Sequence, residues 1–200
     1  MDIVYFCLHH PALQDRRQNL QSQLDTLNLD VEWVCSFLPE EIEIPSTARF
    51  KNKNEYSLYL KQQYCIEQQV QKEIPLIVIL EDDVLLPENF CNFVSNCVRE
   101  FTSIKGDLLF LGTCCNITAR NVQPGKSVYY EPDYKSRCAH CYAVTLPAAR
   151  AIMKHINSQQ CAYDFKLNQI IAQESLRVCY AEPGILQATE ERLIKSSLQL

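Results

Sequence analysis

The chain has 200 residues, 47% of them hydrophobic and 22% charged, which is typical of one globular domain of ordinary size spanning residues 1–200. A net charge of −5 without a basic cluster argues against nucleic acid as a partner. No apolar run approaches the length of a transmembrane segment, and the N-terminus lacks the basic region of a signal peptide. The 11 cysteines are an odd number at irregular spacing, so we expect reduced thiols and a cytoplasmic protein.

Strand-like and helix-like patterns alternate along the chain. Apolar runs predict strands at 3–8, 31–37, 76–80, 107–111, 128–130, 141–145 and 176–180. Amphipathic patterns predict helices at 11–27, 54–73, 87–101, 147–157 and 163–172, and the third has the clearest apolar stripe. The last twenty residues show no obvious element. This alternation predicts an α/β sandwich with a mostly parallel central sheet.

The strand predicted at 76–80 runs directly into Glu81, Asp82 and Asp83. In open parallel sheets, ligands bind just beyond the carboxyl ends of the strands. Glu81 and Asp83 would share a face if the chain continued extended, and two converging carboxylates suit a hard divalent cation that bridges to phosphates. The sequence therefore predicts a metal–phosphate site at this strand end.

These acids have two other interpretations. One acid could cap the next helix, which Pro87 would start, but a cap does not require three acids. A phospho-receiver domain also has paired acids after its opening strand, but it needs a further Asp after a second buried strand. The nearest candidate, Asp133, does not follow such a strand.

Six segments, in this order, resemble the glycosyltransferases of family 25, which include lipooligosaccharide and procollagen galactosyltransferases. They are IVYFCLHHPALQDRRQNLQSQL, IPLIVILEDDVLLPENF, GDLLFLG, HCYAVTLPAARAIM, CAYDFKLNQII and YAEPGILQATE. The resemblance implies a GT-A-like three-layer sandwich, a UDP-sugar donor and Mn²⁺ or Mg²⁺. It also implies transfer of a hexose, such as galactose or glucose, to a glycan or to a glycosylated or hydroxylated protein, with inversion. The long loop at 113–126 would then set acceptor choice.

The resemblance also suggests roles for the acidic residues. Asp83 is expected to contact the metal, with Glu81 as a second ligand, while Glu81 or Asp82 would bind the ribose or a metal-bound water. Some relatives of the fold use a late histidine as a metal ligand, and this chain has none after residue 155. The third ligand is therefore expected to be Gln187 or Glu190, or water.

Basic residues and one later acid complete the expected site. Arg16 and Arg17 could reach the diphosphate, or they could be exposed helix charges. His9 and His10 follow the first strand, where the fold holds the nucleotide base, or they form an ordinary turn. Asp164 matches the family's aspartate and is expected to be the catalytic base, kept ionised by its position at a helix start, although it could simply be an N-cap.

One further departure from the family lies in the helix before the acidic motif. This chain has Ser57-Leu58 and Lys61-Gln62 where the family carries Ser-His or Lys-His. Two other hypotheses remain open. The chain could be another metal-dependent phosphate-ester enzyme, such as a nucleotidyltransferase. It could also be a non-catalytic relative that binds a sugar nucleotide or a protein, which the missing histidine keeps open.

Overall fold

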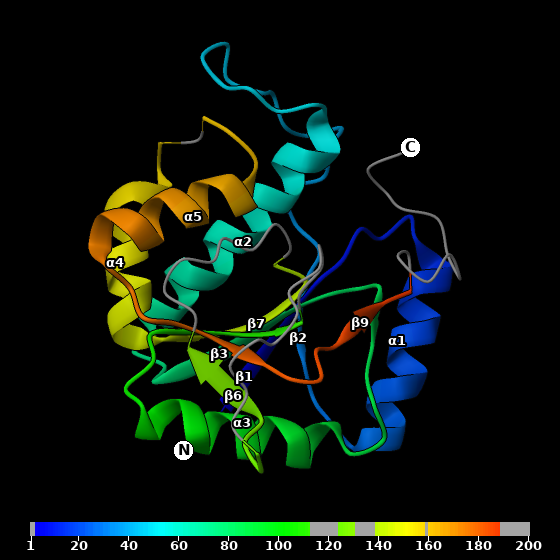
Figure 1. Cartoon of the computed structure of the whole chain (residues 1–200). Helices are drawn as coiled ribbons and strands as arrows, with labels where there is room; N and C mark the ends of the chain where they lie inside the picture. The colour runs from blue at the N-terminus through cyan, green and yellow to red at the C-terminus, as the bar shows by residue number, and fades with distance from the viewer. Residues whose placement is uncertain (1–2, 113–123, 131–138, 159, 189–200) are drawn as a thin grey trace.

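The central feature is a seven-stranded sheet, seen in a computed structural model that describes residues 3–112, 124–130, 139–158 and 160–188 (Figure 1). Its strand order is β2-β1-β3-β7-β5-β8-β6. The strands are β1 (Ile3–Leu8), β2 (Glu32–Val34), β3 (Leu76–Glu81), β5 (Leu108–Gly112), β6 (Val128–Tyr130), β7 (Cys141–Thr145) and β8 (Val178–Ala181). Each of the seven strands predicted from the sequence is therefore present.

The sheet is mixed, with most strands running in one direction. β2, β1 and β3 are parallel to one another, and β5 is parallel to β8. β7 is antiparallel to both β3 and β5, and β6 is antiparallel to β8. Five strands therefore point the same way, so the predicted mostly parallel α/β sheet is confirmed. Their carboxyl ends meet at one edge, which we call the carboxyl edge.

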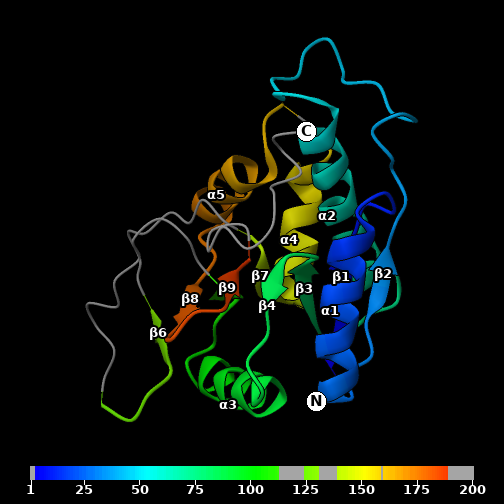
Figure 2. The same cartoon turned by 90° about the vertical axis from the view of Figure 1, so that its right-hand side faces the viewer.

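Helices cover both faces of the sheet (Figures 1 and 2). They are α1 (Gln14–Leu27), α2 (Lys53–Gln71), α3 (Phe90–Ser103), α4 (Leu146–Ile156) and α5 (Tyr163–Glu174). One core cluster joins the sheet to α2, α4 and α5, and a second joins its other face to α1 and α3. This arrangement confirms the predicted three-layer sandwich.

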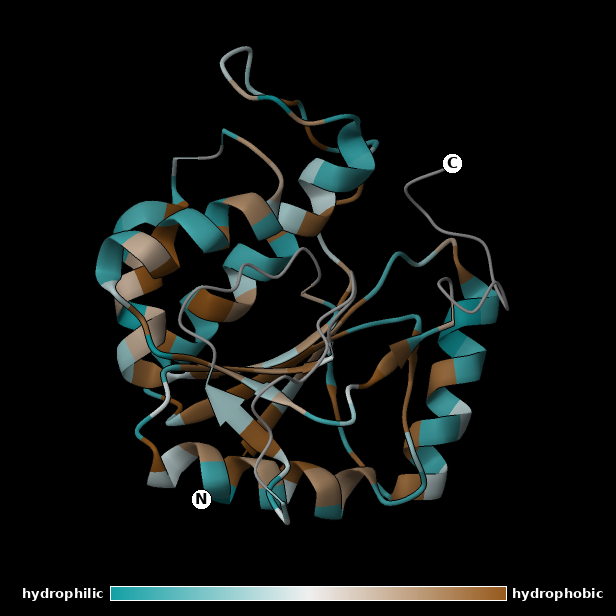
Figure 3. Ribbon diagram, in the orientation of Figure 1, coloured by the Kyte–Doolittle hydropathy of each residue, from teal (hydrophilic) through white to brown (hydrophobic). Residues whose placement is uncertain are grey.

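The distribution of apolar side chains explains why these segments pack as they do. The first five residues of β3 are buried, which suits a central strand with helices on both faces. The apolar stripe of α3 is buried as predicted, through Phe90, Val94, Cys97, Val98 and Phe101. Figure 3 shows the strands of the central sheet as mostly hydrophobic, while the helices alternate between hydrophobic and hydrophilic faces.

Several element ends differ from the predictions for identifiable reasons. The first helix begins at Gln14 because the residues after Pro11 form a turn in which Leu13 N–H donates to the His10 carbonyl at 2.8 Å. The second strand ends at Val34, and Phe37 has a φ of 60°, which no β-strand residue adopts. The third helix begins at Phe90 rather than residue 87.

A two-stranded antiparallel sheet was not predicted. It pairs β4 (Val84–Leu85) with β9 (Leu186–Gln187). The expectation that the last twenty residues contain no element is therefore wrong at β9. A two-residue strand has too few positions to show a hydrophobic period, so sequence reasoning had no signal for it. Glu190, Asp133 and most of the loop 113–126 lie outside the described residues.

The cysteines fit the expectation of free thiols where they are described. The following are unpaired: Cys7, Cys35, Cys65, Cys91, Cys97, Cys141, Cys161 and Cys179. Most of them are buried, where a thiol behaves as a small apolar group. Among the described segments, no helix has both the length and the apolar character needed to cross a bilayer.

Candidate active site at the carboxyl edge

The carboxyl edge gathers polar residues from segments far apart in the sequence. His9 follows β1, and Glu81 to Asp83 end β3. Because β7 is antiparallel to β3, with Cys141 opposite Leu80, the residue before β7, His140, lies at the same edge. The Glu81 N–H donates to the His140 carbonyl at 2.8 Å. The topology thus brings most of the predicted site residues together.

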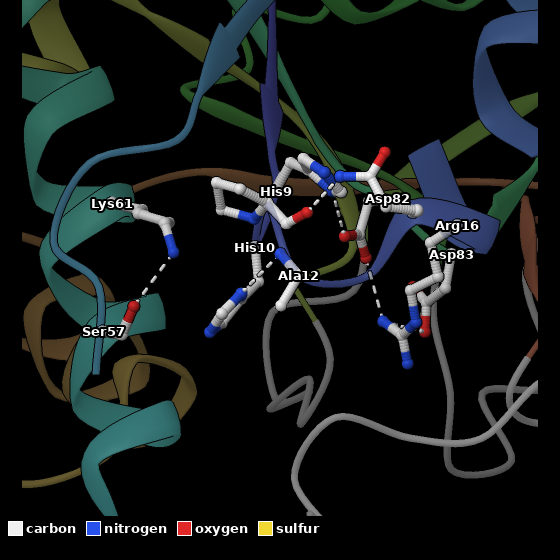
Figure 4. A network of polar contacts seen from close by, with 10 residues as sticks. His9, His10, Ala12, Arg16, Ser57, Lys61, Asp82 and Asp83 are labelled. Carbon is white, nitrogen blue, oxygen red and sulfur yellow. Dashed lines mark hydrogen bonds and ion pairs between the residues drawn. The ribbon is translucent and has the colours of Figure 1, made fainter. Parts of the chain in front are cut away.

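Asp82 is buried, and both of its carboxylate oxygens are engaged (Figure 4). Oδ2 lies 2.7 Å from His9 Nδ1, and Oδ1 accepts a hydrogen bond from Arg16 Nη1 at 2.9 Å. An ionised carboxylate only accepts, so Nδ1 of His9 carries the hydrogen and Nε2 is left as an acceptor. Asp82 therefore fixes the orientation of His9 and anchors α1 to the end of β3.

The other residues near His9 have distinct roles. The ring of the partly exposed Trp33 meets the His9 ring edge-on, with centroids 5.5 Å apart. The guanidinium of Arg17 lies 3.4 Å from the centre of the Trp33 ring, a cation–π contact. His10 Nδ1 accepts from the Ala12 N–H at 3.2 Å, so the turn alternative holds for His10. Of the two arginines, Arg16 is the one that reaches the acids.

Asp83 is also buried and is held by two separate elements. From α1, Arg16 Nη1 approaches its Oδ2 at 3.6 Å. From β9, Gln187 Nε2 donates to Oδ1 at 3.1 Å, and the Ala188 N–H donates to the Asp83 carbonyl at 2.7 Å. Gln187, predicted as a metal ligand, thus lies beside Asp83 and positions its carboxylate.

A second glutamine holds the segment after the acids. Gln23, on α1, donates from Nε2 to the Val84 carbonyl at 3.3 Å and accepts from the Leu86 N–H at Oε1, at 2.7 Å. Its side-chain amide therefore pairs with β4 much as a neighbouring strand would. Sequence reasoning missed Gln23, although it lies seven positions after Arg16, a spacing that repeats one face of a helix.

The segment after β8 contacts His140, whose backbone carbonyl is hydrogen-bonded to Glu81. The Ile185 N–H donates to the Leu111 carbonyl at 2.7 Å, and His140 Nε2 lies 2.9 Å from the Ile185 carbonyl. A carbonyl only accepts, so Nε2 carries the hydrogen, and burial lowers the pKa of His140. A Cβ at Gly112 would lie 2.2 Å from His140 Nε2, which explains the glycine at the end of β5. Sequence reasoning did not single out His140.

Glu81 and Asp164 form the other half of the site. Burial raises the pKa of Glu81 well above its ordinary value, and Asp83, Asp164 and Asp82 raise it further, whereas Arg16 lowers it. Asp164, in the first turn of α5, is thus close enough to Glu81 for their charges to interact. Among the described residues, neither Glu81 nor Asp164 forms a salt bridge within 4.0 Å.

The structure corrects the expected charge state of Asp164. Burial raises its pKa to about 7, and the hydrogen bond from its own backbone N–H only partly offsets this effect. The helix start was expected to keep this carboxyl ionised at neutral pH, but desolvation outweighs it. Asp164 does not cap α5, whose N-cap is Ala162. A carboxyl group that titrates near neutral pH suits a general base.

The oxygen atoms of the acids are candidate ligands for a divalent cation. Within the described segments, no three His, Cys, Asp or Glu side chains come close enough together to hold a metal ion. Mg²⁺-type ions, however, are usually held by one or two carboxylates, with phosphate oxygens and water completing the shell. Asp83 and Glu81 provide two hard oxygen donors in surroundings rich in carboxylates, so the residues fit such an ion.

Gln62 is one of the two residues, with Leu58, that stand where the resemblance would place a histidine. Its Oε1 accepts a hydrogen bond from Tyr142 Oη at 2.7 Å, and Tyr142 Oη lies 2.8 Å from Tyr163 Oη. All three side chains are buried. The two tyrosines therefore belong to the core, and Gln62 completes their hydrogen bonding.

No protein-family model matches this sequence, and no curated protein matches it. Among solved structures, the chain is similar to a glycosyltransferase involved in glycosylation of the major capsid of PBCV-1, with 12% identity, a TM-score of 0.51 and coverage of 97% of this chain and 100% of that one. An enzyme assigned as a glucose-1-phosphate thymidylyltransferase from Bacillus anthracis has 12% identity, a TM-score of 0.49 and coverage of 99% and 93%. At 12% identity a likeness bears on the fold alone, and only the first, with its TM-score of 0.51, supports the assignment of a GT-A-like fold.

Proposed function

We propose that this chain is a metal-dependent glycosyltransferase that moves a hexose from a UDP-sugar to a glycan or to a glycosylated or hydroxylated protein, with inversion. The observation that carries the proposal is the group of acids at the carboxyl edge, where the charges of Asp83 and Asp164 both raise the pKa of Glu81. Carboxylates that raise one another's pKa in a buried setting favour a bound cation. Such a group at the carboxyl edge of a GT-A-like sheet suits a sugar diphosphate, and membership of family 25 is part of this proposal.

Asp83 and Glu81 would hold Mn²⁺ or Mg²⁺. A divalent cation there would supply positive charge that stabilises the departing diphosphate as the glycosidic bond breaks. Gln187 and the Ala188 N–H fix the position of Asp83. Arg16, already at the acids, would contact the diphosphate. His9, oriented by Asp82, would present Nε2 to the nucleoside.

Asp164 would act as the general base. Its carboxylate would take the proton of the acceptor hydroxyl while that oxygen attacks the anomeric carbon from the face opposite the leaving group, which inverts the configuration. Its raised pKa of about 7 makes the carboxylate a better proton acceptor than an ordinary aspartate. Because its charge interacts with that of Glu81, it would lie near the metal-bound end of the donor.

The test is to measure donor binding and product together. A panel of UDP-sugars with Mn²⁺ is screened by thermal unfolding, in which a donor present at 100 times its dissociation constant stabilises the protein by about 2.7 kcal/mol. The matching sugar is then incubated with acceptors, and released UDP is compared with glycosylated product. We expect equal amounts of the two. Release of pyrophosphate from a nucleoside triphosphate and a sugar phosphate would identify a nucleotidyltransferase instead. Tight donor binding without turnover would identify a non-catalytic relative.

A further inference from the structure

Lys61 is a buried lysine that the proposed mechanism does not use. It lies in the middle of α2 and is only 4% exposed. Its Nζ donates to Ser57 Oγ at 2.9 Å, and Ser57 Oγ in turn donates to the Phe37 carbonyl at 2.5 Å. The hydroxyl of Ser57 is thereby oriented with a lone pair toward the ammonium. Figure 4 shows Lys61 and Ser57 together on α2, with the ammonium joined to the Ser57 hydroxyl, in the same view as His9 and Asp82.

The charge of Lys61 has no close counterion in the part of the chain that the structure describes. No carboxylate of these residues lies within 4.0 Å of its Nζ. Arg16, which is equally buried, lies 2.9 Å from Asp82. Burial lowers the pKa of Lys61, and the more distant Asp82 and Glu40 act in the opposite direction. The ammonium is thus desolvated without a salt bridge.

Such an arrangement is costly for folding. A buried charge without a partner is less favourable than an apolar side chain of the same size, and one hydroxyl does not replace the lost hydration. Lys61 lies four residues after Ser57 and four before Cys65, which are both buried, so the site for Lys61 is a core position of α2. Asp82, whose charge acts on Lys61 from beyond salt-bridge distance, belongs to the acidic centre, and together these facts point to an anionic ligand.

We propose that Lys61 binds a phosphate group, and that this group belongs to the diphosphate of the sugar-nucleotide donor. The inference rests on the proposed function for the identity of the ligand. A lysine ammonium is a compact point charge with three donors, which suits a phosphate oxygen. Asp83 and Glu81 act on the diphosphate through a cation, whereas Lys61 acts on it directly. The donor therefore meets two independent phosphate contacts, one dependent on metal and one not.

The test uses inorganic pyrophosphate, with Mn²⁺ or with EDTA, and follows the fluorescence of Trp33, the single tryptophan of the chain. Trp33 contacts His9, so it reports on this part of the carboxyl edge. Lys61→Met removes the charge at similar length. Its control is Lys72→Met, at the exposed end of the same helix, about 16 Å along the axis.

Lys61→Met is expected to weaken pyrophosphate binding about 10- to 100-fold with or without Mn²⁺, since a hydrogen bond to a charged group is lost. Its melting temperature should stay unchanged or rise, because an unpaired buried charge is removed. Lys72→Met should change neither quantity. Wild-type affinity in Lys61→Met would overturn the inference. A Lys61→Met protein that unfolds would also overturn it, since the ammonium would then be structural.

The same titration separates this inference from the proposed function. Asp83→Asn should lose only the part of pyrophosphate binding that depends on Mn²⁺. If pyrophosphate binding depends on Lys61 but no UDP-sugar binds, the proposed donor is wrong while the phosphate contact of Lys61 stands. If UDP-sugars bind equally well to wild type and Lys61→Met, the donor stands and the role of Lys61 is wrong.

Discussion

The acidic centre has two sides that differ in how their charges are balanced. On one side, Asp82 lies between His9 and Arg16, with distances of 2.7 and 2.9 Å, so its charge is compensated inside the protein. On the other side, burial raises the pKa of both Glu81 and Asp164 above the ordinary value, and the charges of Asp83 and Asp164 raise that of Glu81 further. Glu81 and Asp82, which are adjacent in the sequence, thus have opposite electrostatic surroundings.

The difference separates residues that hold the fold from residues that serve a ligand. A buried carboxylate with two partners stabilises the arrangement around it, and removing it leaves those partners unpaired. A buried carboxylate among other carboxylates destabilises the free protein and is relieved when a cation or a proton arrives. We therefore expect substitution of Asp82 to lower the free energy of unfolding, and substitution of Asp164 to lower activity.

The largest effect is expected for Asp164→Asn. Loss of a general base lowers turnover by about 10²- to 10⁴-fold, while donor binding should persist because Asp83 is untouched. The free energy of unfolding should not fall at pH 8, since the raised pKa means that the folded state is destabilised when Asp164 ionises. Turnover and UDP-sugar affinity are measured on one preparation. Normal turnover, or loss of donor binding, would assign Asp164 another role.

Asp82→Ala should destabilise the protein by about 3–5 kcal/mol, because Arg16 is left buried without its closest carboxylate partner. Chemical denaturation measures the change, with Asp15→Ala as the control. Asp15 is an exposed acid of the same helix as Arg16, and its removal should have little effect. Equal stability of the two variants would show that Asp82 does not stabilise the fold. The two sides of the acidic centre would then not differ in their effect on stability.

The pH dependence of the free energy of unfolding should depend on the raised pKa of Asp164. Folded Asp164 keeps its proton up to a pH of about 7, whereas the unfolded chain loses it near the ordinary value of 3.8. The folded state therefore binds more protons between these values, so the contribution of Asp164 to stability falls as pH rises through this window. Denaturation at several pH values should show a smaller decline in Asp164→Asn than in wild type. Identical pH profiles would contradict the raised pKa.

Gln23→Leu should have the smallest of these effects. Two hydrogen bonds to the backbone of β4 are lost, each worth about 0.5–1.5 kcal/mol, and the acids become less well positioned. We expect Mn²⁺-dependent UDP affinity to fall roughly tenfold. Gln18→Leu, at an exposed position of the same helix, is the matched control. If both variants bind alike, Gln23 does not position the acids.

Local patterns of the sequence predicted most of the fold. The apolar run that ends at Glu81 and the stripe of α3 appear in the structure as expected, because both depend on burial periods that a single segment shows. The β4–β9 pair could not be predicted in this way. It depends on Val84 and Gln187 meeting across 103 positions, and its strands are too short to show a period.

The site was predictable in its residues more than in its contacts. Asp83 and Gln187 were both proposed for the metal, yet only the structure shows their direct hydrogen bond. The pKa of Asp164 was misjudged because burial depends on packing around α5, which the sequence does not specify. Lys61 and Gln23 were missed because each is a polar residue on a helix face whose buried side becomes clear only once the layers are assembled.

The most direct test of the metal–phosphate site is calorimetric titration of wild type and Asp83→Asn with UDP, with and without Mn²⁺. We expect that wild type binds UDP much more tightly when Mn²⁺ is present, and that Asp83→Asn loses this gain while its unfolding curve stays close to that of wild type. If Asp83→Asn keeps the full Mn²⁺-dependent gain in affinity, Asp83 does not hold the cation and the central claim is wrong.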